Sequence, residues 1–254
     1  MYNVPDKTRL FGKKLVHFPE CPSTNTEAIR FTESDGICHG AVFICDHQSA
    51  GRGQAGNRWE SEPGKNLTFS IVLENPVEPE NHFFLNVFLS LAIAKCLNQI
   101  TGKLFQVKWP NDLMAGGKKI GGILIENSVM GKAIRYSVAG IGLNVNQERF
   151  NFSAATSLFL FTGKKFKTEE LLGDLLASIE TEFSRLRGKD FPGLKGEWLD
   201  HLYLFNTRHQ FFKDGEPFEG VITGIDHHGR LEMEVNSVTR YFNFKEIDFS
   251  KSEF

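Results

Sequence analysis

The feature that most restricts the fold of this chain is a glycine-rich loop that no helix can follow. Residues 51–56, GRGQAG, match the pattern G-x-G-x-x-G and come soon after the β-branched and aromatic run at 40–47, which predicts a buried strand. In a dinucleotide-binding fold this pattern opens a helix whose N-terminus meets the pyrophosphate. Here Pro63 and Gly64 break any such helix. The loop therefore excludes a dinucleotide-binding fold, and the lack of downstream HRD and DFG motifs excludes a protein kinase.

The same loop carries groups that suit an anionic ligand. Its alternating glycines allow backbone N–H groups to converge on an anion. Arg52 and Arg58 add planar donors that match phosphate or carboxylate, and Trp59 offers a stacking face to a base. The alternative interpretation is a surface loop anchored by a buried Trp59. We expect a ligand-binding loop.

Hydrophobic patterning predicts an α+β fold. Strands are expected where apolar residues alternate or run on, at residues 40–47, 67–73, 104–109, 120–126 and 133–141. Helices are expected from residue 24, over 81–100 and from residue 168, and Thr24 with Glu27 fits a capping box at the first of them. Short strands alternate with turns near the C-terminus, as in a small β barrel, at 210–212, 218–225, 230–235 and 238–244. We therefore expect a body over residues 1–205 and a barrel over residues 206–254.

Composition limits the classes of partner. The 29 Lys and Arg residues face 31 Asp and Glu residues, a net charge of −2, so no global basic field attracts nucleic acid or anionic lipid. Residues 83–97 are apolar but interrupted by polar side chains, which predicts a buried helix rather than a membrane span. The N-terminus has no apolar signal region, and we expect a cytoplasmic protein. Four cysteines without metal-ligand spacing are expected to be reduced and mostly buried: Cys21, Cys38, Cys45 and Cys96.

Two further segments combine glycines with polar groups. KWPND at residues 108–112 forms a tight corner after a predicted strand, and GGKKIGGILIE follows at 116–126. Lys119 begins the next strand beside the glycine pair 121–122, which allows a ligand to approach the backbone closely. This lysine either reaches the surface or directs its charge into a pocket. GIGLNVN at 140–146 ends another strand with amides able to bind a hydroxyl or phosphate.

Together these segments resemble the biotin protein ligases over nearly the whole chain. The matching segments stand in family order: Ser23-Thr24-Asn25, QSAGRGQAGNRW at 48–59, KWPNDLM at 108–114, KKIGGILIE at 118–126 and GIGLNVN at 140–146. The resemblance implies a mixed β-sheet flanked by helices, followed by an SH3-like β barrel. It also implies condensation of biotin with ATP to biotinoyl-5′-AMP, with release of pyrophosphate, and transfer of biotin to a lysine of a biotin carboxyl carrier protein of acetyl-CoA carboxylase or a related enzyme, with release of AMP.

The resemblance assigns roles to individual residues. Lys119 bridges the biotin carboxylate and the α-phosphate, and Arg52 covers the carboxylate; these two are the implied catalytic residues. Biotin contacts are implied for Ser23, Thr24, Gln48, Gly51, Arg52, Lys119 and Gly122. Contacts with ATP and the adenylate are implied for Gly53, Gln54, Trp59, Asn111, Lys119 and Asn144.

Some of these assignments have alternatives. Ser23 and Thr24 also fit as helix caps, and Asn111 and Asp112 also fit as residues that shape the corner. Asp112 is otherwise the candidate ligand for Mg²⁺. Gln54 stands where many family members carry another arginine, which leaves one fewer cation for the triphosphate.

The expected substrates are biotin and ATP with Mg²⁺, and the expected partner is a carrier domain. Because the first matching segment follows only 22 residues, we expect no winged-helix domain and, with the near-neutral net charge, no DNA binding. The charge and the interrupted apolar stretch likewise predict no membrane partner, and a homodimer is one possible assembly. A lipoate–protein ligase would show an Arg-rich glycine segment with a His, which differs from GRGQAGNRW. A noncatalytic biotin sensor would be expected to lack Lys119 or the loop.

Overall fold

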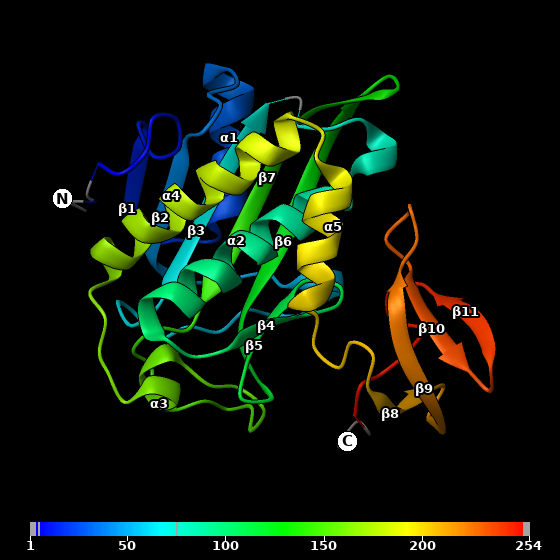
Figure 1. Ribbon diagram of the computed structural model, residues 1–254. Helices are drawn as coiled ribbons and strands as arrows, with labels where there is room; N and C mark the ends of the chain where they lie inside the picture. Colours follow the sequence, from blue (N-terminus) through cyan, green and yellow to red (C-terminus); the bar gives the residue numbers. More distant parts are fainter. Residues whose placement is uncertain (1–3, 5, 75, 251–254) are drawn as a thin grey trace.

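A mixed seven-stranded sheet forms the body of the protein. The computed structural model describes residues 4, 6–74 and 76–250 (Figure 1). The strand order is β1-β2-β3-β7-β6-β5-β4; β1 and β2 are parallel, and the other neighbours are antiparallel. The strands are β1 Leu15–Cys21, β2 Val42–Gln48, β3 Leu67–Glu74, β4 Phe105–Lys108, β5 Asp112–Ala115, β6 Lys118–Met130 and β7 Ala133–Leu143.

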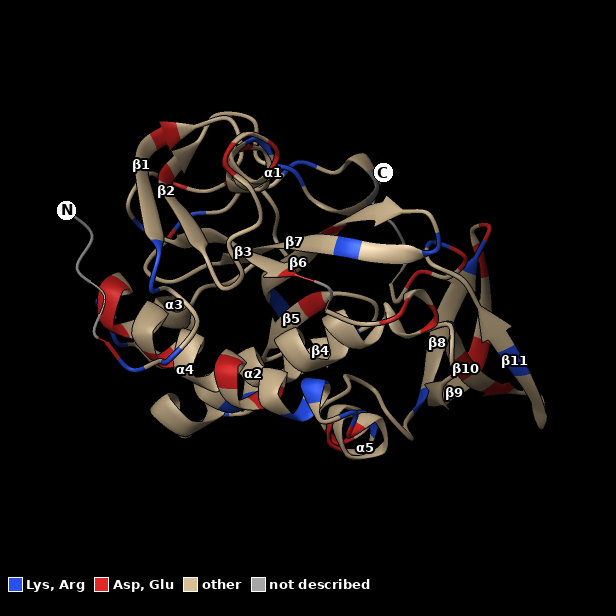
Figure 2. Ribbon diagram, turned by 90° about the horizontal axis from the view of Figure 1, so that it is seen from above, with Lys and Arg blue, Asp and Glu red and all other residues tan. Residues whose placement is uncertain are grey.

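Helices cover both faces of this sheet. In Figure 2, α1 (Thr24–Asp35) lies on one side, and α2 (Phe84–Thr101), α4 (Thr168–Arg187) and α5 (Phe191–Asp200) lie on the other. Short helical turns complete the body: η1 Gln54–Gly56, η2 Pro79–Asn81 and α3 Leu158–Thr162. A mixed sheet flanked by helices is the fold class that the sequence predicted, and it is confirmed.

Helix α2 is the apolar core helix that the sequence predicted. Among the described residues, the stretch Pro79–Thr101 is long and apolar enough to cross a membrane by length and composition, but 67% of its apolar window is buried inside the structure. It packs between the sheet and helices α4 and α5. All four cysteines are free thiols, three of them buried and Cys38 half-buried.

A second, antiparallel sheet follows α5. Its order is β11-β10-β9-β8, and its strands are β8 Arg208–Lys213, β9 Glu216–Ile225, β10 Leu231–Val235 and β11 Val238–Phe242. The chain then returns to β8, where the backbones of Phe212 and Asp248 exchange two hydrogen bonds of 2.9 and 2.8 Å. These are the predicted C-terminal strands, whereas the division of the chain at residue 205 stays a prediction.

The two sheets meet at the corner that follows β4. Trp109, which is only 2% exposed, donates a hydrogen bond of 2.8 Å from Nε1 to the carbonyl of Gly229 in the β9–β10 turn. Its ring also lies 5.2 Å from that of Phe244. The second sheet is therefore anchored beside the KWPND segment.

The sequence missed four elements: β1, β5, α3 and α5. Strand β1 is an edge strand that contains Pro19, and β5 has four residues, so neither shows a usable alternation. Helix α3 has five residues. Helix α5 carries Pro192 and Gly193 in its first turn, where Asp190 accepts a hydrogen bond from the Gly193 N–H at 3.1 Å.

The predicted capping box at the start of α1 is wrong. The N-cap is Ser23, and within the described residues it makes no side-chain capping bond. The Thr24 hydroxyl instead donates to Gln48 Oε1 at 3.2 Å and lies 2.7 Å from Ser70 Oγ. The Thr24 hydroxyl therefore bonds to Gln48 on β2 and to Ser70 on β3, and not to the backbone at the start of α1.

Candidate active site

The glycine-rich loop folds back on itself as a narrow turn. Arg52 pairs with Arg58 across it, the Gly53 N–H donates to the Asn57 carbonyl at 2.6 Å, and the Trp59 N–H donates to the Gly51 carbonyl at 3.0 Å. Apart from the three-residue 3-10 turn η1 within the loop, the next regular element along this described stretch is strand β3 and not an α-helix. The exclusion of a dinucleotide-binding fold is confirmed. The expected convergence of loop N–H groups on an anion is wrong for Gly53, because its N–H is used inside the turn.

Trp59 packs onto strand β7 at a glycine. A Cβ atom at Gly142 would lie 2.5 Å from Trp59 Cε2, so only glycine lets the indole lie this close to the strand. The buried Trp59 Nε1 has no hydrogen-bond partner among the described residues. Because buried donors in proteins are nearly always paired, this one is available to a ligand.

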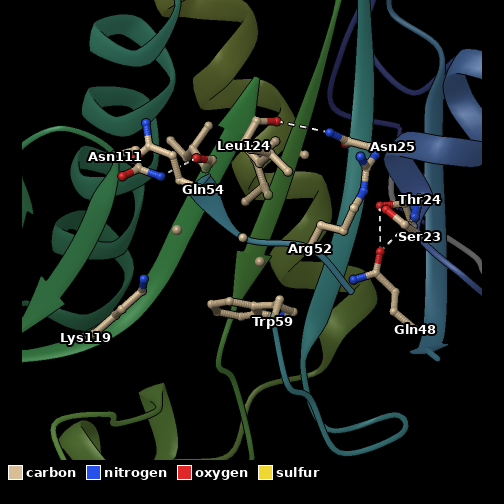
Figure 3. Close-up of a pocket in the computed structure, with 16 residues that line it drawn as sticks. Ser23, Thr24, Asn25, Gln48, Arg52, Gln54, Trp59, Asn111, Lys119 and Leu124 are labelled. Carbon is tan, nitrogen blue, oxygen red and sulfur yellow. Dashed lines mark hydrogen bonds between the residues drawn. The ribbon is translucent and has the colours of Figure 1, made fainter. Parts of the chain in front are cut away.

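Trp59 lies at the centre of a cavity with polar groups on both sides. Figure 3 shows Ser23, Thr24, Gln48 and Arg52 on one side of the indole, and Asn111 and Lys119 on the other. The full lining is Ser23, Thr24, Asn25, Gln48, Arg52, Gly53, Gln54, Trp59, Asn111, Lys119, Gly122, Ile123, Leu124, Gly140, Ile141 and Gly142. We call this the first cavity.

A buried hydrogen-bond network fixes one end of the first cavity. Gln48 Oε1 accepts from the Thr24 N–H at 2.7 Å as well as from its hydroxyl. Ser70 Oγ lies 2.6 Å from Asn25 Oδ1, and a Cβ at Gly140 would clash with the same amide. The side chains from α1, β2 and β3 are thus held in one arrangement, which gives a preorganised set of donors and acceptors.

Both cations of the first cavity are paired with carboxylates. Arg52 Nη2 lies 2.8 Å from Glu126 Oε2, which also accepts from Asn25 Nδ2 at 2.7 Å. Lys119 Nζ lies 2.6 Å from Asp112 Oδ1. The two cationic side chains are 46% and 36% exposed, respectively. Ion pairs this exposed contribute little to stability, so an anionic ligand can replace the carboxylates at small cost.

A second, larger cavity adjoins the first. It is lined by Gly53, Gln54, Asn57, Arg58, Trp59, Lys108, Trp109, Pro110, Asn111, Asp112, Lys119, Phe244, Lys245, Ile247, Asp248 and Phe249. The residues that border both cavities are Gly53, Gln54, Trp59, Asn111 and Lys119. Lys119 therefore stands where the two cavities meet.

The second cavity is rich in cations. Arg58, Lys108, Lys119 and Lys245 border it, against the two carboxylates Asp112 and Asp248. Burial lowers the pKa of Lys108 below the usual lysine range, an effect that the nearby Asp112 partly opposes. The surplus of positive charge suits a polyanion.

The structure gathers most of the predicted site residues in these two linings. The exceptions are Gly51 and Asn144, which lie outside the linings that the described residues form. A Cβ at Gly51 would lie 2.6 Å from the Trp59 carbonyl oxygen, so this glycine shapes the loop. Asn144 is 4% exposed and donates from Nδ2 to the Thr156 carbonyl at 3.0 Å. It supports the segment behind Lys119, and the binding roles of both residues stay predictions.

Asn111 and Asp112 differ in how they are held. The side chain of Asn111 donates from Nδ2 to the backbone carbonyl of Ile123 at 2.7 Å. The backbone carbonyl of Asn111 accepts a hydrogen bond from the Ile123 N–H at 3.0 Å. These bonds tie the corner to β6, in line with a shaping role. Asp112 lines the second cavity, and its carboxylate pairs with Lys119. Among the described residues, no group of three or more His, Cys, Asp or Glu side chains is arranged to hold a metal ion.

Sequence reasoning missed several lining residues. Asn25 stands in a matched segment but was not singled out, although its amide contacts Glu126. Lys108 and the segment 244–249 line the second cavity. The segment is distant in sequence from every matched motif, so no local signal could have indicated it.

The comparisons with known proteins agree with this geometry. The family described as "Biotin/lipoate A/B protein ligase family" matches residues 18–144. The chain belongs to this family. A biotin--[acetyl-CoA-carboxylase] ligase of Paracoccus denitrificans is 32% identical over 82% of this chain and 89% of its own. A bifunctional ligase/repressor BirA of Bacillus subtilis is 27% identical over 91% of this chain and 72% of its own.

The solved structures agree in fold. A biotin protein ligase from Aquifex aeolicus in complex with biotin and ATP has a TM-score of 0.78 and 28% identity, over 94% of this chain and all of that one. The resemblance inferred from the five sequence segments is thereby confirmed, together with the two-sheet architecture of the family fold.

Proposed function

We propose that this chain attaches biotin to a lysine of a biotin carboxyl carrier protein in two steps. In the first, the biotin carboxylate attacks the α-phosphorus of ATP, and pyrophosphate leaves. In the second, the neutral ε-amine of the carrier lysine attacks the carbonyl of biotinoyl-5′-AMP, and AMP leaves. The ligase relatives from Paracoccus and Aquifex support this reaction. The observation that carries the proposal is the position of Lys119 on the border shared by both cavities.

The first cavity suits biotin. Its network of Thr24, Gln48 and Asn25 offers fixed donors and acceptors for a ureido group, and Leu124 and Ile141 provide apolar contact. The substrate carboxylate then lies toward Lys119 and Arg52. Each cation exchanges a protein carboxylate for the substrate, which keeps its charge paired throughout.

The second cavity suits the nucleotide. Bringing a carboxylate onto an α-phosphate opposes two negative charges, so preorganised cations must stabilise the transition state. Lys119 can contact both reacting groups, and Trp59 is the assigned aromatic partner of adenine. Mg²⁺ enters with ATP, and such ions usually need one or two protein carboxylates besides phosphate oxygens. Asp112 and Asp248, which border the cavity, fit that requirement.

The proposed setting is the cytoplasm, with a carrier domain as the protein partner and without DNA or a membrane. The near-neutral net charge of −2 supports the absence of nucleic-acid and anionic-lipid partners.

The test is a biotin-dependent exchange of labelled pyrophosphate into ATP, followed by transfer of biotin to a purified carrier domain. We expect exchange with biotin and little with lipoate or octanoate. Equal exchange with lipoate would contradict the proposal in favour of a lipoate ligase. Binding of biotin without any exchange would contradict it in favour of a noncatalytic sensor.

A further inference from the structure

Trp59 and Lys119 border both cavities but come from different parts of the chain (Figure 3). Trp59 follows the glycine-rich loop, and residues 60–66 lead from it into β3, whereas Lys119 stands near the start of β6. Adenylation needs the two side chains in one arrangement, because one is assigned to adenine and the other to the reacting groups. A buried junction joins the two segments that carry them.

A short strip of backbone, residues 154–156, holds Lys119 from one side. The Lys119 N–H donates to the Ala154 carbonyl at 2.8 Å, and the Lys119 carbonyl accepts from the Thr156 N–H at 2.8 Å. The strip thereby pairs with β6 just before the point where β7 takes over, since the pairing of β6 with β7 begins at Gly121. We call these three residues the Lys119 strip.

Gln147 joins the Lys119 strip to the segment that follows the glycine-rich loop. Its backbone carbonyl accepts at 2.6 Å from Oγ of Ser157, the residue directly after the strip. Its side-chain Oε1 accepts from the Glu62 N–H at 3.0 Å and also from Asn66 Nδ2. Gln147 and Asn66 are each 6% exposed and Ser157 is fully buried, so the junction lies in the interior.

The junction is built from amides that use both of their ends. Gln147 Nε2 donates to the Arg149 carbonyl at 2.7 Å, and Asn66 Oδ1 accepts from the Val145 N–H at 2.9 Å. Buried polar networks with every bond made hold one geometry, whereas losing a partner is costly. In the described part of the chain Gln147 borders neither cavity. It can therefore affect the reaction only through the residues that it holds.

We propose that Gln147 is a positioning residue of adenylation, which fixes Lys119 relative to Trp59 through its buried amide. The inference rests on the proposed function for the role of Lys119. A shift of the Lys119 strip would move the ammonium group away from the point where carboxylate and α-phosphate meet. The network of Thr24 and Gln48, on the other side of the indole, would stay in place. The kcat should therefore respond while the KM for biotin does not.

The test replaces two buried or half-buried amides with leucine. Q147L removes the junction, and N98L removes the amide whose Oδ1 accepts from the Phe105 N–H at 2.7 Å, at the end of α2. We expect Q147L to lower the kcat of pyrophosphate exchange about tenfold, with an unchanged KM for biotin. N98L should lower the melting temperature and keep the kcat of the wild type. S157A, a smaller change at the end of the Lys119 strip, should lower kcat in the same direction, and it carries the test if Q147L does not fold.

Hydrogen exchange separates this inference from the proposed function. The amides of Lys119 and Thr156 should exchange faster in Q147L than in the wild type, and N98L shows the change that lower stability causes by itself. If the wild type catalyses no biotin-dependent pyrophosphate exchange, the proposed function fails, and these two amides still decide the role of Gln147. Unchanged protection of both amides, or an unchanged kcat in the folded variants at Gln147 and Ser157, would overturn the proposal. So would an equal loss of kcat in N98L.

Discussion

Lys119 Nζ and Asp112 Oδ1 lie 2.6 Å apart across the neighbouring strands β6 and β5. The pair holds the lysine at the border of the two cavities, and its partner is a carboxylate, the same chemical group that biotin presents. The Asp112 carboxylate therefore occupies, beside the nucleotide cavity, the place on Lys119 that we assign to the biotin carboxylate. Binding then exchanges one anion for another.

The first prediction concerns Lys119. Replacing it with Ala should remove one preorganised donor from the adenylation transition state and slow pyrophosphate exchange by about 10²–10³. Lys119→Arg should not restore full activity, because a planar guanidinium places its charge differently. The rate of pyrophosphate exchange is measured for Lys119→Ala and for Lys119→Arg, and thermal melting verifies that both variants fold.

Lys118 is the matched control for this prediction. It is adjacent in sequence and exposed, and it faces away from both linings because side chains alternate along a strand. Lys118→Ala should therefore leave exchange nearly unchanged. Equal damage from both substitutions in folded protein would show that the bridging lysine is wrongly assigned.

A second prediction tests the metal role of Asp112. Asp112→Asn removes one negative charge from the second cavity, so the concentration of Mg²⁺ needed for half-maximal exchange should rise. Asp214→Asn, in the exposed β8–β9 turn, serves as the control. An unchanged Mg²⁺ requirement would assign Asp112 to positioning Lys119 alone.

The parts of the fold that the sequence predicted are those with long, regular patterns. Helices α2 and α4 carry apolar residues over many turns, and strands β6 and β7 follow continuous apolar runs. Strand β5 was missed because four residues between two turns are too few to establish a period. Thr24 was misassigned because its hydroxyl has partners from β2 and β3, which no local pattern contains.

The residues of the candidate site also fall into those that the sequence could predict and those that it could not. Lys119, Arg52 and Gln48 belong to recognisable segments, and the structure brings them to one cavity. Lys245 and Asp248 reach the second cavity only because the C-terminal segment folds back against Trp109. That approach depends on packing between two sheets, and neither composition nor spacing encodes it locally.

The third prediction concerns the order of the glycine-rich loop. Ordering a glycine-rich segment costs more conformational entropy than ordering other residues, and Arg52 must leave Glu126 to meet a ligand. We expect amides of residues 51–59 and 116–119 to exchange hydrogen faster in the free protein than with biotinoyl-5′-AMP bound. Amides in β3, which lies in the core, serve as the internal control. Equally slow exchange in both states would contradict a loop that closes over its ligand.

A fourth prediction follows from His39. Its Nδ1 accepts a hydrogen bond from the Glu74 N–H at 3.0 Å, and burial lowers the pKa of the imidazole below its ordinary value of 6.5, with Arg187 adding to the effect. The unfolded chain therefore binds a proton at a higher pH than the folded protein does. The free energy of unfolding should fall as the pH drops below about 6.5, until the folded-state pKa is reached.

His39→Asn isolates this effect, because its amide oxygen can accept the same hydrogen bond and does not titrate in this range. Urea denaturation between pH 5 and pH 8 should give a shallower slope for the variant. The lowered pKa values of Asp226 and Glu180 act in a separate window, below their ordinary values of 3.8 and 4.5. Identical slopes for wild type and variant would exclude His39 as the source.

The last prediction uses the contact between Gly142 and Trp59. Gly142→Ala places a methyl group only 2.5 Å from Trp59 Cε2, which is too close for a non-bonded contact. The indole must therefore move out of the position where it borders both cavities. Because the strand can keep its hydrogen bonds, we expect the variant to fold, with weaker binding of both biotin and ATP. Gly196→Ala is the control, since nothing lies within 4 Å of a Cβ there and alanine favours the helix α5. Intrinsic tryptophan fluorescence and the two KM values decide the matter: unchanged constants in Gly142→Ala would mean that Trp59 does not set the shape of either cavity.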